Sequence, residues 1–237
     1  MDMLLFGAFP YVALVVFMIG TIYRYGHGFK YSSLSSQLLE TEKLFSASLS
    51  FHVGIIMIFL GHLLGFLFPS IFSSIGGSTL VAFETVGVVF GVLAIIGLVL
   101  LFIRRHTNDR IKVVTNRMDT VIEALLIIQF ILGVVIAVGS KWGLAWYASD
   151  MVPYLHSIFT FSPDITAVVV LPWIVKTHIV LAFAIILLVP FSRLVHFLVA
   201  PFHYISRPFQ VVRWNWNPKT VRDAKTSWND VRRPTNN

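Results

Sequence analysis

Five long apolar segments divide residues 1–200, and each has the length that a helix needs to cross a bilayer. A transmembrane helix takes about 20 predominantly apolar residues. Over the whole chain, 57% of the residues are hydrophobic and only 12% are charged, about half the charged fraction usual in soluble proteins. The sequence therefore predicts an all-α membrane protein, a bundle of five transmembrane helices at about 3–23, 44–68, 81–103, 120–138 and 168–200.

Basic residues are distributed unevenly between the segments that join these helices. With five spans, all but Lys141 and Lys176 of the 18 lysines and arginines fall on one side. Because basic residues near a membrane are retained on its cytoplasmic side, we expect the N-terminus outside and the basic tail, 201–237, in the cytoplasm. The protein would lie in the cell's inner (cytoplasmic) membrane, surrounded by lipid. This orientation accounts for the net charge of +7. We therefore do not interpret the charge as a sign of nucleic-acid binding, and we expect no nucleic-acid partner.

Four of the eight histidines fall within the expected spans, where an unpaired polar side chain is costly. His52 and His62 lie on the second span, and His178 and His196 on the fifth. These spans run in opposite directions, so His52 and His196 share the inner level and His62 and His178 the outer level. Two stacked haems, each with two axial histidines from facing helices, need this arrangement. Packing hydrogen bonds or a proton relay are the alternative roles of such histidines.

Helix geometry sets a condition on this pairing. His178 and His196 are 18 residues apart, which is five turns and ~27 Å on one straight helix, so they would share a face. His52 and His62 are 10 residues apart, ~15 Å, and roughly 80° out of register. The pairing therefore requires a tilt, a kink at Pro190, or haems that lie at a slant.

Small residues accompany the histidines and allow two interpretations. A macrocycle that lies against a helix needs a face without bulk, but closely packed helices need the same. The glycines concerned are Gly54, Gly61, Gly65, Gly87 and Gly91. The chain has no cysteine, which excludes thiolate zinc sites and cysteine-ligated iron–sulfur clusters.

Several stretches resemble the γ subunit of respiratory nitrate reductase, a family of five-helix dihaem cytochromes b. They are GTIYRYG, SSQLL, FHVGIIMIFLGHLLG, IIQFILG and THIVLAFAIILLVPFSRLVHFLVAPFHYISRPFQVVR. The resemblance covers about residues 9–213. It implies two haem b cofactors, with His52 and His196 on the iron of the inner haem and His62 and His178 on that of the outer haem.

The resemblance also implies a reaction and partners. Quinol from the quinone pool is oxidised near the outer haem, and protons leave to the outside. Electrons pass to an iron–sulfur subunit and then to a molybdenum catalytic subunit, which holds the nitrate site. In one member of the family, a basic residue near the start of the third span is associated with quinone binding. This chain departs from that pattern, because the region reads GGSTLVAFETVG and Glu84 is its only charge.

Two sets of residues are candidates for these roles. Quinol would lie beside His62, Gly61 and Gly65, with Glu84 as proton acceptor, although Glu84 is equally compatible with a hydrogen bond to a neighbouring helix. Arginines at the inner span ends would bind haem propionates or serve only as membrane anchors. They are Arg24, Arg104 and Arg193. Glu123, about one turn inside the fourth span, would reach water.

Two other functions remain open from the sequence. One is a quinone-reactive cytochrome b of another complex, related to sulfite or heterodisulfide reduction or to nitrite oxidation with reversed electron flow. The other is a haem-free anchor or transporter. The sequence has no hydrolytic triad or phosphate loop, so we expect no catalytic residue of that kind.

Overall fold

The computed structural model describes residues 1–26, 39, 42–139 and 146–199, and the predicted tail at 201–237 lies outside them. Five helices in this part are long and apolar enough to cross a membrane, which confirms the predicted number of spans. Their cores are α1 (Phe9–Gly26), α2 (Glu42–Leu67), α4 (Gly77–Thr107), α6 (Arg117–Gly139) and α10 (Trp173–Leu188). The shorter elements are η1 (Met3–Ala8), α3 (Pro69–Ser73), α5 (Asp109–Lys112), η2 (Tyr147–Met151), α8 (Val152–Phe159), α9 (Thr166–Val169), η3 (Val189–Phe191) and η4 (Arg193–Val199).

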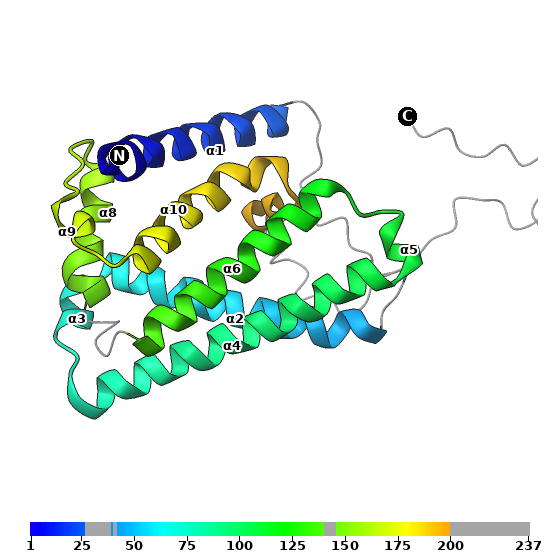
Figure 1. Ribbon diagram of the computed structural model, residues 1–237, viewed down its shortest axis with the longest axis horizontal. Helices are drawn as coiled ribbons and strands as arrows, with labels where there is room; N and C mark the ends of the chain where they lie inside the picture. Colours follow the sequence, from blue (N-terminus) through cyan, green and yellow to red (C-terminus); the bar gives the residue numbers. More distant parts are fainter. Residues whose placement is uncertain (27–38, 40–41, 140–145, 200–237) are drawn as a thin grey trace, which may run out of the picture. The chain divides into compact units, whose positions relative to one another are not determined.

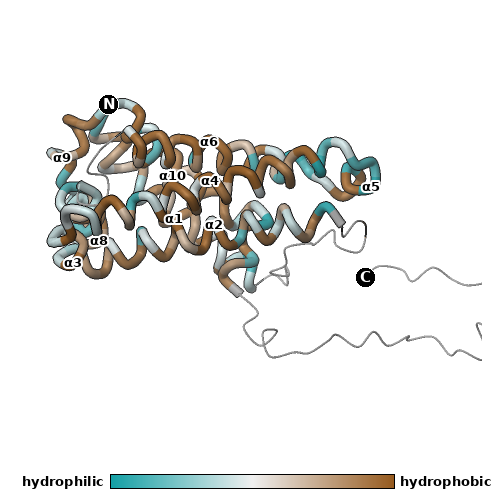
Figure 2. Tube along the Cα trace, turned by 90° about the horizontal axis from the view of Figure 1, so that it is seen from below, coloured by the Kyte–Doolittle hydropathy of each residue, from teal (hydrophilic) through white to brown (hydrophobic). Residues whose placement is uncertain are grey.

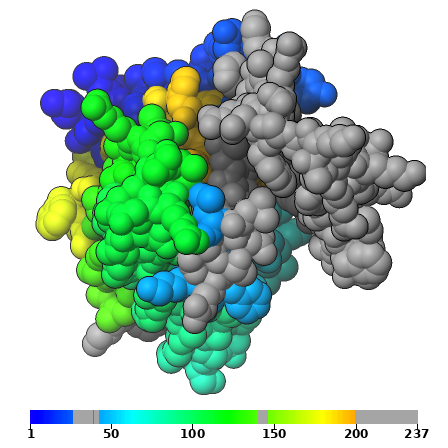
Figure 3. All heavy atoms as spheres, turned by 90° about the vertical axis from the view of Figure 1, so that its right-hand side faces the viewer, coloured from blue at the N-terminus to red at the C-terminus, as the bar shows by residue number. Residues whose placement is uncertain are grey.

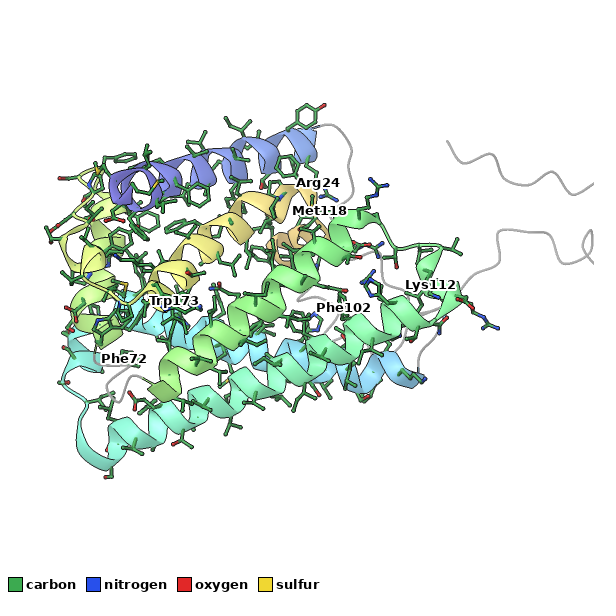
Figure 4. The ribbon with its side chains drawn as sticks, viewed as in Figure 1. Arg24, Phe72, Phe102, Lys112, Met118 and Trp173 are labelled. Atoms are coloured by element: carbon green, nitrogen blue, oxygen red, sulfur yellow. The ribbon has the colours of Figure 1, made fainter. Side chains whose placement is uncertain are left out.

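The long helices pack in the order α2, α4, α6, α10, α1 (Figure 1). Their shared core contains Phe51 of α2, Leu98 of α4 and Phe130 of α6, and Leu188 of α10 packs against it. We name the two ends of the bundle after the short helices found there, the α5 end and the α8 end. Arg24, Met118 and Lys112 lie toward the α5 end, whereas Phe72 and Trp173 lie toward the α8 end (Figure 4). The sequence predicts the α5 end on the cytoplasmic side.

The exterior of the bundle is apolar along its length. Large side chains such as Ile56, Val89 and Ile131 are exposed on it, as lipid-facing side chains are. Figure 2 shows apolar colours along the long helices and polar colours at α5. This pattern matches a lipid-embedded belt with polar ends.

Three glycines allow close contact between helices. A Cβ at Gly54 would lie 2.7 Å from the carbonyl oxygen of Phe90 on α4. A Cβ at Gly91 would lie 2.7 Å from Val134 on α6, and one at Gly97 would collide with the backbone of α2. Close packing therefore accounts for Gly54 and Gly91.

The fifth span is broken near its C-terminal end. The α-helix stops at Leu188, a 3₁₀ turn contains Pro190, and Ser192 is extended at φ −118° and ψ 176° before η4 begins. The prediction that His178 and His196 share the face of one straight helix is therefore wrong, because proline removes a helical hydrogen bond and its ring clashes with the preceding turn. Of the three arrangements that would allow the histidine pairing, the kink at Pro190 is present.

Helix α1 stabilises this break. Arg24 NH1 donates to the carbonyls of Pro190 and Ser192, at 2.7 and 3.0 Å. Gly20 lets the Pro190 ring approach, since a Cβ there would lie 2.8 Å from it. Arg24 thus provides a charged donor to two carbonyls at the break, where the regular helical hydrogen bonds are interrupted.

The α8 end is closed by the segment that follows the fourth span. Tyr154 of α8 donates to the carbonyl of Phe6, at 2.8 Å, and Tyr11 donates to the carbonyl of Ile158, at 3.0 Å. Burial raises the pKa of the Tyr154 hydroxyl, so it remains a donor. These bonds tie the segment to the N-terminal helix.

Candidate functional site

At the α5 end, the broken fifth span brings His196 of η4 to His52 of α2. Their ring centres are 6.3 Å apart, with the ring planes at 62°. If each nitrogen lies about 2 Å from a shared metal and about 1 Å from its own ring centre, the two centres are about 6 Å apart. The pair therefore has the separation that two axial ligands of one iron require.

The hydrogen bonds of three histidines favour one ligand nitrogen. Their Nδ1–H groups donate to main-chain carbonyls three or four residues earlier, which leaves the lone pair on Nε2. The donors and acceptors are His52 to Ser48 at 2.7 Å, His62 to Ile58 at 2.9 Å and His196 to Arg193 at 2.6 Å. Each Nε2 is thus available to a metal.

His178 on α10 differs from the other three. Its Nε2 lies 3.2 Å from the amide nitrogen of the Gln129 side chain on α6, and the main chain of Gln129 also interacts with the ring. His62 is near enough to interact with His178 electrostatically. The His178 ring therefore meets polar groups of α6, whereas the other three histidines bond to a carbonyl of their own segment.

Tyr147 of η2 covers His62 at the α8 end. Its hydroxyl donates to the His62 carbonyl at 3.0 Å, and the two ring centres are 5.3 Å apart in an edge-to-face arrangement. A Cβ at Gly65 would lie 2.8 Å from the Tyr147 ring, so Gly65 makes this contact possible. Burial raises the pKa of Tyr147 to about 12. The sequence analysis did not single out Tyr147 as a functional residue. The only feature that could have indicated it is the high number of aromatic residues in the segment after the fourth span.

The other quinol candidates lie on α2 and α4. Gly61 is exposed and faces open space, because nothing lies within 4 Å of a Cβ built there. Glu84 is half-buried on α4, and Gly87, nearly one turn further on, also faces open space. Unlike Gly54 and Gly91, the open glycines are not explained by helix contacts.

A network of buried charges joins three elements at the α5 end. Asp119 of α6 accepts from Arg105 of α4, at 3.3 Å, and pairs with Nε of Arg193 on η4, at 2.8 Å. Glu123 pairs with the Nε of Arg105, at 2.7 Å, and is only 7% exposed. The expectation that Glu123 reaches water is therefore wrong, because Arg105 folds back over it. The contact of Asp119 with the fifth span was not predicted from the sequence.

The three candidate propionate arginines lie at this end and already contact protein groups. Arg24 holds the break in the fifth span, and Arg193 pairs with Asp119 and donates to the Val114 carbonyl. Arg104 is buried on α4. A propionate role for any of them stays a prediction.

The surface of the α5 end is basic. Figure 3 views this end, with α5 and α6 in green and the start of α2 in blue. Arg110, Lys112 and Arg117 are exposed there. The basic loop thus has two groups of cations. Arg104 is buried and Arg105 pairs with carboxylates inside the bundle, whereas Arg110, Lys112 and Arg117 form the basic surface.

The histidines expected in loops are engaged in local contacts where they are described. His106, in the last turn of α4, donates to the Phe102 carbonyl at 2.8 Å; Phe102 is labelled in Figure 4. His156 on α8 lies edge-to-face on Phe66. His27 and His203 lie outside the described residues. Within the described part, no group of three or more His, Asp and Glu side chains is arranged as a metal site.

Comparisons with known proteins agree on one family. The family model described as "Nitrate reductase gamma subunit" matches residues 2–215. The Nitrate reductase gamma chain of Bacillus subtilis is 34% identical over 218 residues, which cover 89% of this chain and 97% of that protein. The Respiratory nitrate reductase 2 gamma chain of Escherichia coli is 33% identical over 220 residues, 90% of this chain and 97% of that protein.

Proposed function

The chain belongs to the nitrate reductase gamma subunit family, and from this premise we propose that it is a dihaem cytochrome b that delivers electrons from quinol to a nitrate reductase. The inner haem b binds between His52 and His196, and the outer haem b between His62 and His178. The bound haems supply one-electron carriers across the membrane. The observation that carries the proposal is the 6.3 Å separation of the His52 and His196 rings.

The break at Pro190 is the local reason that this separation is possible. On a continuous helix, His196 would lie ~27 Å beyond His178, whereas His52 and His62 are only ~15 Å apart along α2. The chain instead leaves the α-helix after Leu188 and approaches α2 with a 3₁₀ segment. Arg24 and Asp119 hold that segment from α1 and α6.

At the α8 end, the residues around His62 form the quinol site. Gly61 leaves its face of α2 open, and Tyr147 covers the next turn through Gly65. Glu84 accepts a proton as quinol is oxidised, being an ionisable group at membrane depth. The half-burial of Glu84 and the aromatic cover support a site that excludes bulk water but reaches the outer face.

The α5 end passes electrons to the partner subunits. Its exposed basic side chains suit contact with an iron–sulfur subunit, which in turn reduces the molybdenum subunit that holds the nitrate site. Arg24, Arg104 and Arg193 offer guanidinium groups for the haem propionates. Residues 1–200 form the membrane cytochrome domain, and residues 201–237 form a cytoplasmic tail.

Sidedness makes the reaction electrogenic. Protons are released outside while electrons move to the cytoplasmic side, so each electron crosses a potential worth about 2.3 kcal/mol per 100 mV. The N-terminus lies outside the inner membrane and the tail lies in the cytoplasm, as the distribution of basic residues indicates.

Haem content and quinol reduction test the proposal. We expect the purified subunit to contain two haems b per chain, and a quinol analogue to reduce both. A protein without a haem Soret band would contradict the proposal and favour a haem-free anchor. If the protein contains two haems that quinol does not reduce, and it purifies with soluble subunits other than those of a nitrate reductase, the result would favour a cytochrome b of another complex.

A further inference from the structure

Ser48 lies about one turn before His52 on α2, and both of its oxygen atoms contact the His52 ring. The Ser48 carbonyl oxygen is 2.7 Å from His52 Nδ1, and the hydroxyl oxygen Oγ is 3.2 Å from the same nitrogen. Residues four apart share a helix face, so a short side chain can reach the ring. The buried Phe51 ring lies edge-to-face against the imidazole, with 5.2 Å between the ring centres. His52 is thus oriented by its own helix.

The tautomer of His52 decides what the Ser48 hydroxyl does. A ring nitrogen 2.7 Å from a carbonyl oxygen carries the proton, because a carbonyl can only accept. The second oxygen, Oγ, then accepts from the same Nδ1–H, and the two contacts form a three-centre hydrogen bond. This tautomer leaves the lone pair on Nε2, the nitrogen that the proposed haem iron requires. Iron binding therefore preserves both contacts with Ser48.

The corresponding position before the other histidine of α2 is occupied by Ile58. His62 Nδ1–H donates to the Ile58 carbonyl, at 2.9 Å, but an isoleucine side chain carries no acceptor. The residue four positions before each ligand therefore offers two oxygens to His52 and one to His62. The Ser48 hydroxyl makes the two ligands of α2 chemically unequal.

We propose that Ser48 is a positioning residue of the inner haem, whose hydroxyl acts through His52 and lowers the reduction potential of that haem. This inference rests on the proposed dihaem function and goes beyond the ligand assignment. A lower inner potential makes the reduced haem a stronger electron donor to the next carrier. Ser48 thus favours the transfer of electrons out of the α5 end.

The acceptors of Nδ1–H adjust the electron donation of the ligand. An acceptor there makes the imidazole more basic toward a metal on Nε2, which favours the oxidised iron and lowers its reduction potential. Ser48→Ala removes Oγ but keeps the main-chain carbonyl, so the inner haem stays bound and its potential rises. Ser48→Thr keeps a hydroxyl, so the inner potential remains that of the wild type.

A potentiometric titration of the full chain in its complex tests this role. The haem that disappears in His196→Ala identifies the inner potential. Ile58→Val is the matched control, because it removes one carbon atom at the corresponding position before His62 and no acceptor. The expected result is a raised inner potential in Ser48→Ala, with the outer potential unchanged, and wild-type potentials in Ser48→Thr and Ile58→Val. If Ser48→Ala loses the inner haem, Ser48→Cys, whose sulfur is a weak acceptor, must retain it at a raised potential.

Four results would overturn the role of Ser48. They are an unmoved inner potential in Ser48→Ala, an equal shift in Ser48→Thr, a comparable shift of the outer potential in Ile58→Val, and loss of the inner haem in all three variants at position 48. These results leave the two haems of the wild type intact and so contradict only this inference. A wild-type protein without haem would instead contradict the proposed function, and this inference with it.

Discussion

The charge network at the α5 end predicts a large effect for Asp119→Asn. Asp119 is 3% exposed and holds Arg193 at 2.8 Å and Arg105 at 3.3 Å. Arg105 keeps Glu123 as a partner when Asp119 becomes neutral, whereas Arg193 loses the carboxylate of its ion pair with Asp119. Breaking one buried ion pair costs about 3–5 kcal/mol. We take about 3 kcal/mol, since Asn can still accept a hydrogen bond.

Thermal unfolding of the purified protein in detergent measures this cost. At about 2–4 °C per kcal/mol for a chain of this size, the melting temperature of Asp119→Asn should fall by about 6–12 °C. The segment that Arg193 begins also carries His196, so the inner haem should be lost before the outer one. The double variant Asp119→Asn/Arg193→Gln should lose less than the sum of the single variants.

A surface pair supplies the matched control. Asp109 and Lys112 form an ion pair of 2.8 Å, with side chains 92% and 51% exposed, and Lys112 holds the pKa of Asp109 below its usual range. Because solvent screens exposed pairs, Asp109→Asn should leave the melting temperature unchanged. An equal effect of the two substitutions, or an Asp119→Asn protein as stable as wild type, would refute the reasoning.

Other predictions concern the α8 end and the break. Gly65→Ala should displace the Tyr147 ring and slow quinol oxidation in stopped-flow measurements while both haems remain. Gly139→Ala at the end of α6, whose added Cβ would meet no atom within 4 Å, is the control. The Tyr147 pKa of about 12 lies above the ordinary value of about 10, so the protonated hydroxyl stabilises the fold at neutral pH. That contribution should decline as the pH rises from about 10 through about 12, and Tyr147→Phe should make the decline in denaturation curves smaller. The remaining decline is expected from Tyr154, whose pKa burial also raises. Glu84→Gln should slow quinol oxidation with unchanged haem spectra, and unaltered kinetics would exclude its proton role. Arg24→Met should destabilise the fold by about 2–3 kcal/mol, because two carbonyls lose a charged donor, and so lower the melting temperature by about 4–12 °C.

The sequence predicts the spans well because hydrophobic length is a local property. It predicts the levels of His52 and His196 because topology follows from counting basic residues. The break at Ser192 is harder to foresee, since Pro190 alone permits either a bent helix or a stop. The outcome depends on Arg24 of a distant helix, which provides donors for the freed carbonyls.

Contacts between distant segments explain what the sequence left out. Tyr147 meets His62 only because Gly65 lacks a side chain, and nothing near Tyr147 in the sequence indicates this neighbour. Asp119 likewise resembles an ordinary first-turn carboxylate of α6 until Arg193 arrives from the fifth span.

The pairing of histidines with haems is tested most directly by reduced-minus-oxidised spectra of the wild type and the four single His→Ala variants. We predict two b-type haems in the wild type. His52→Ala and His196→Ala should lose one and the same haem, and His62→Ala and His178→Ala should lose the other. A single haem in the wild type, or a shared loss by His52→Ala and His178→Ala, would contradict the account.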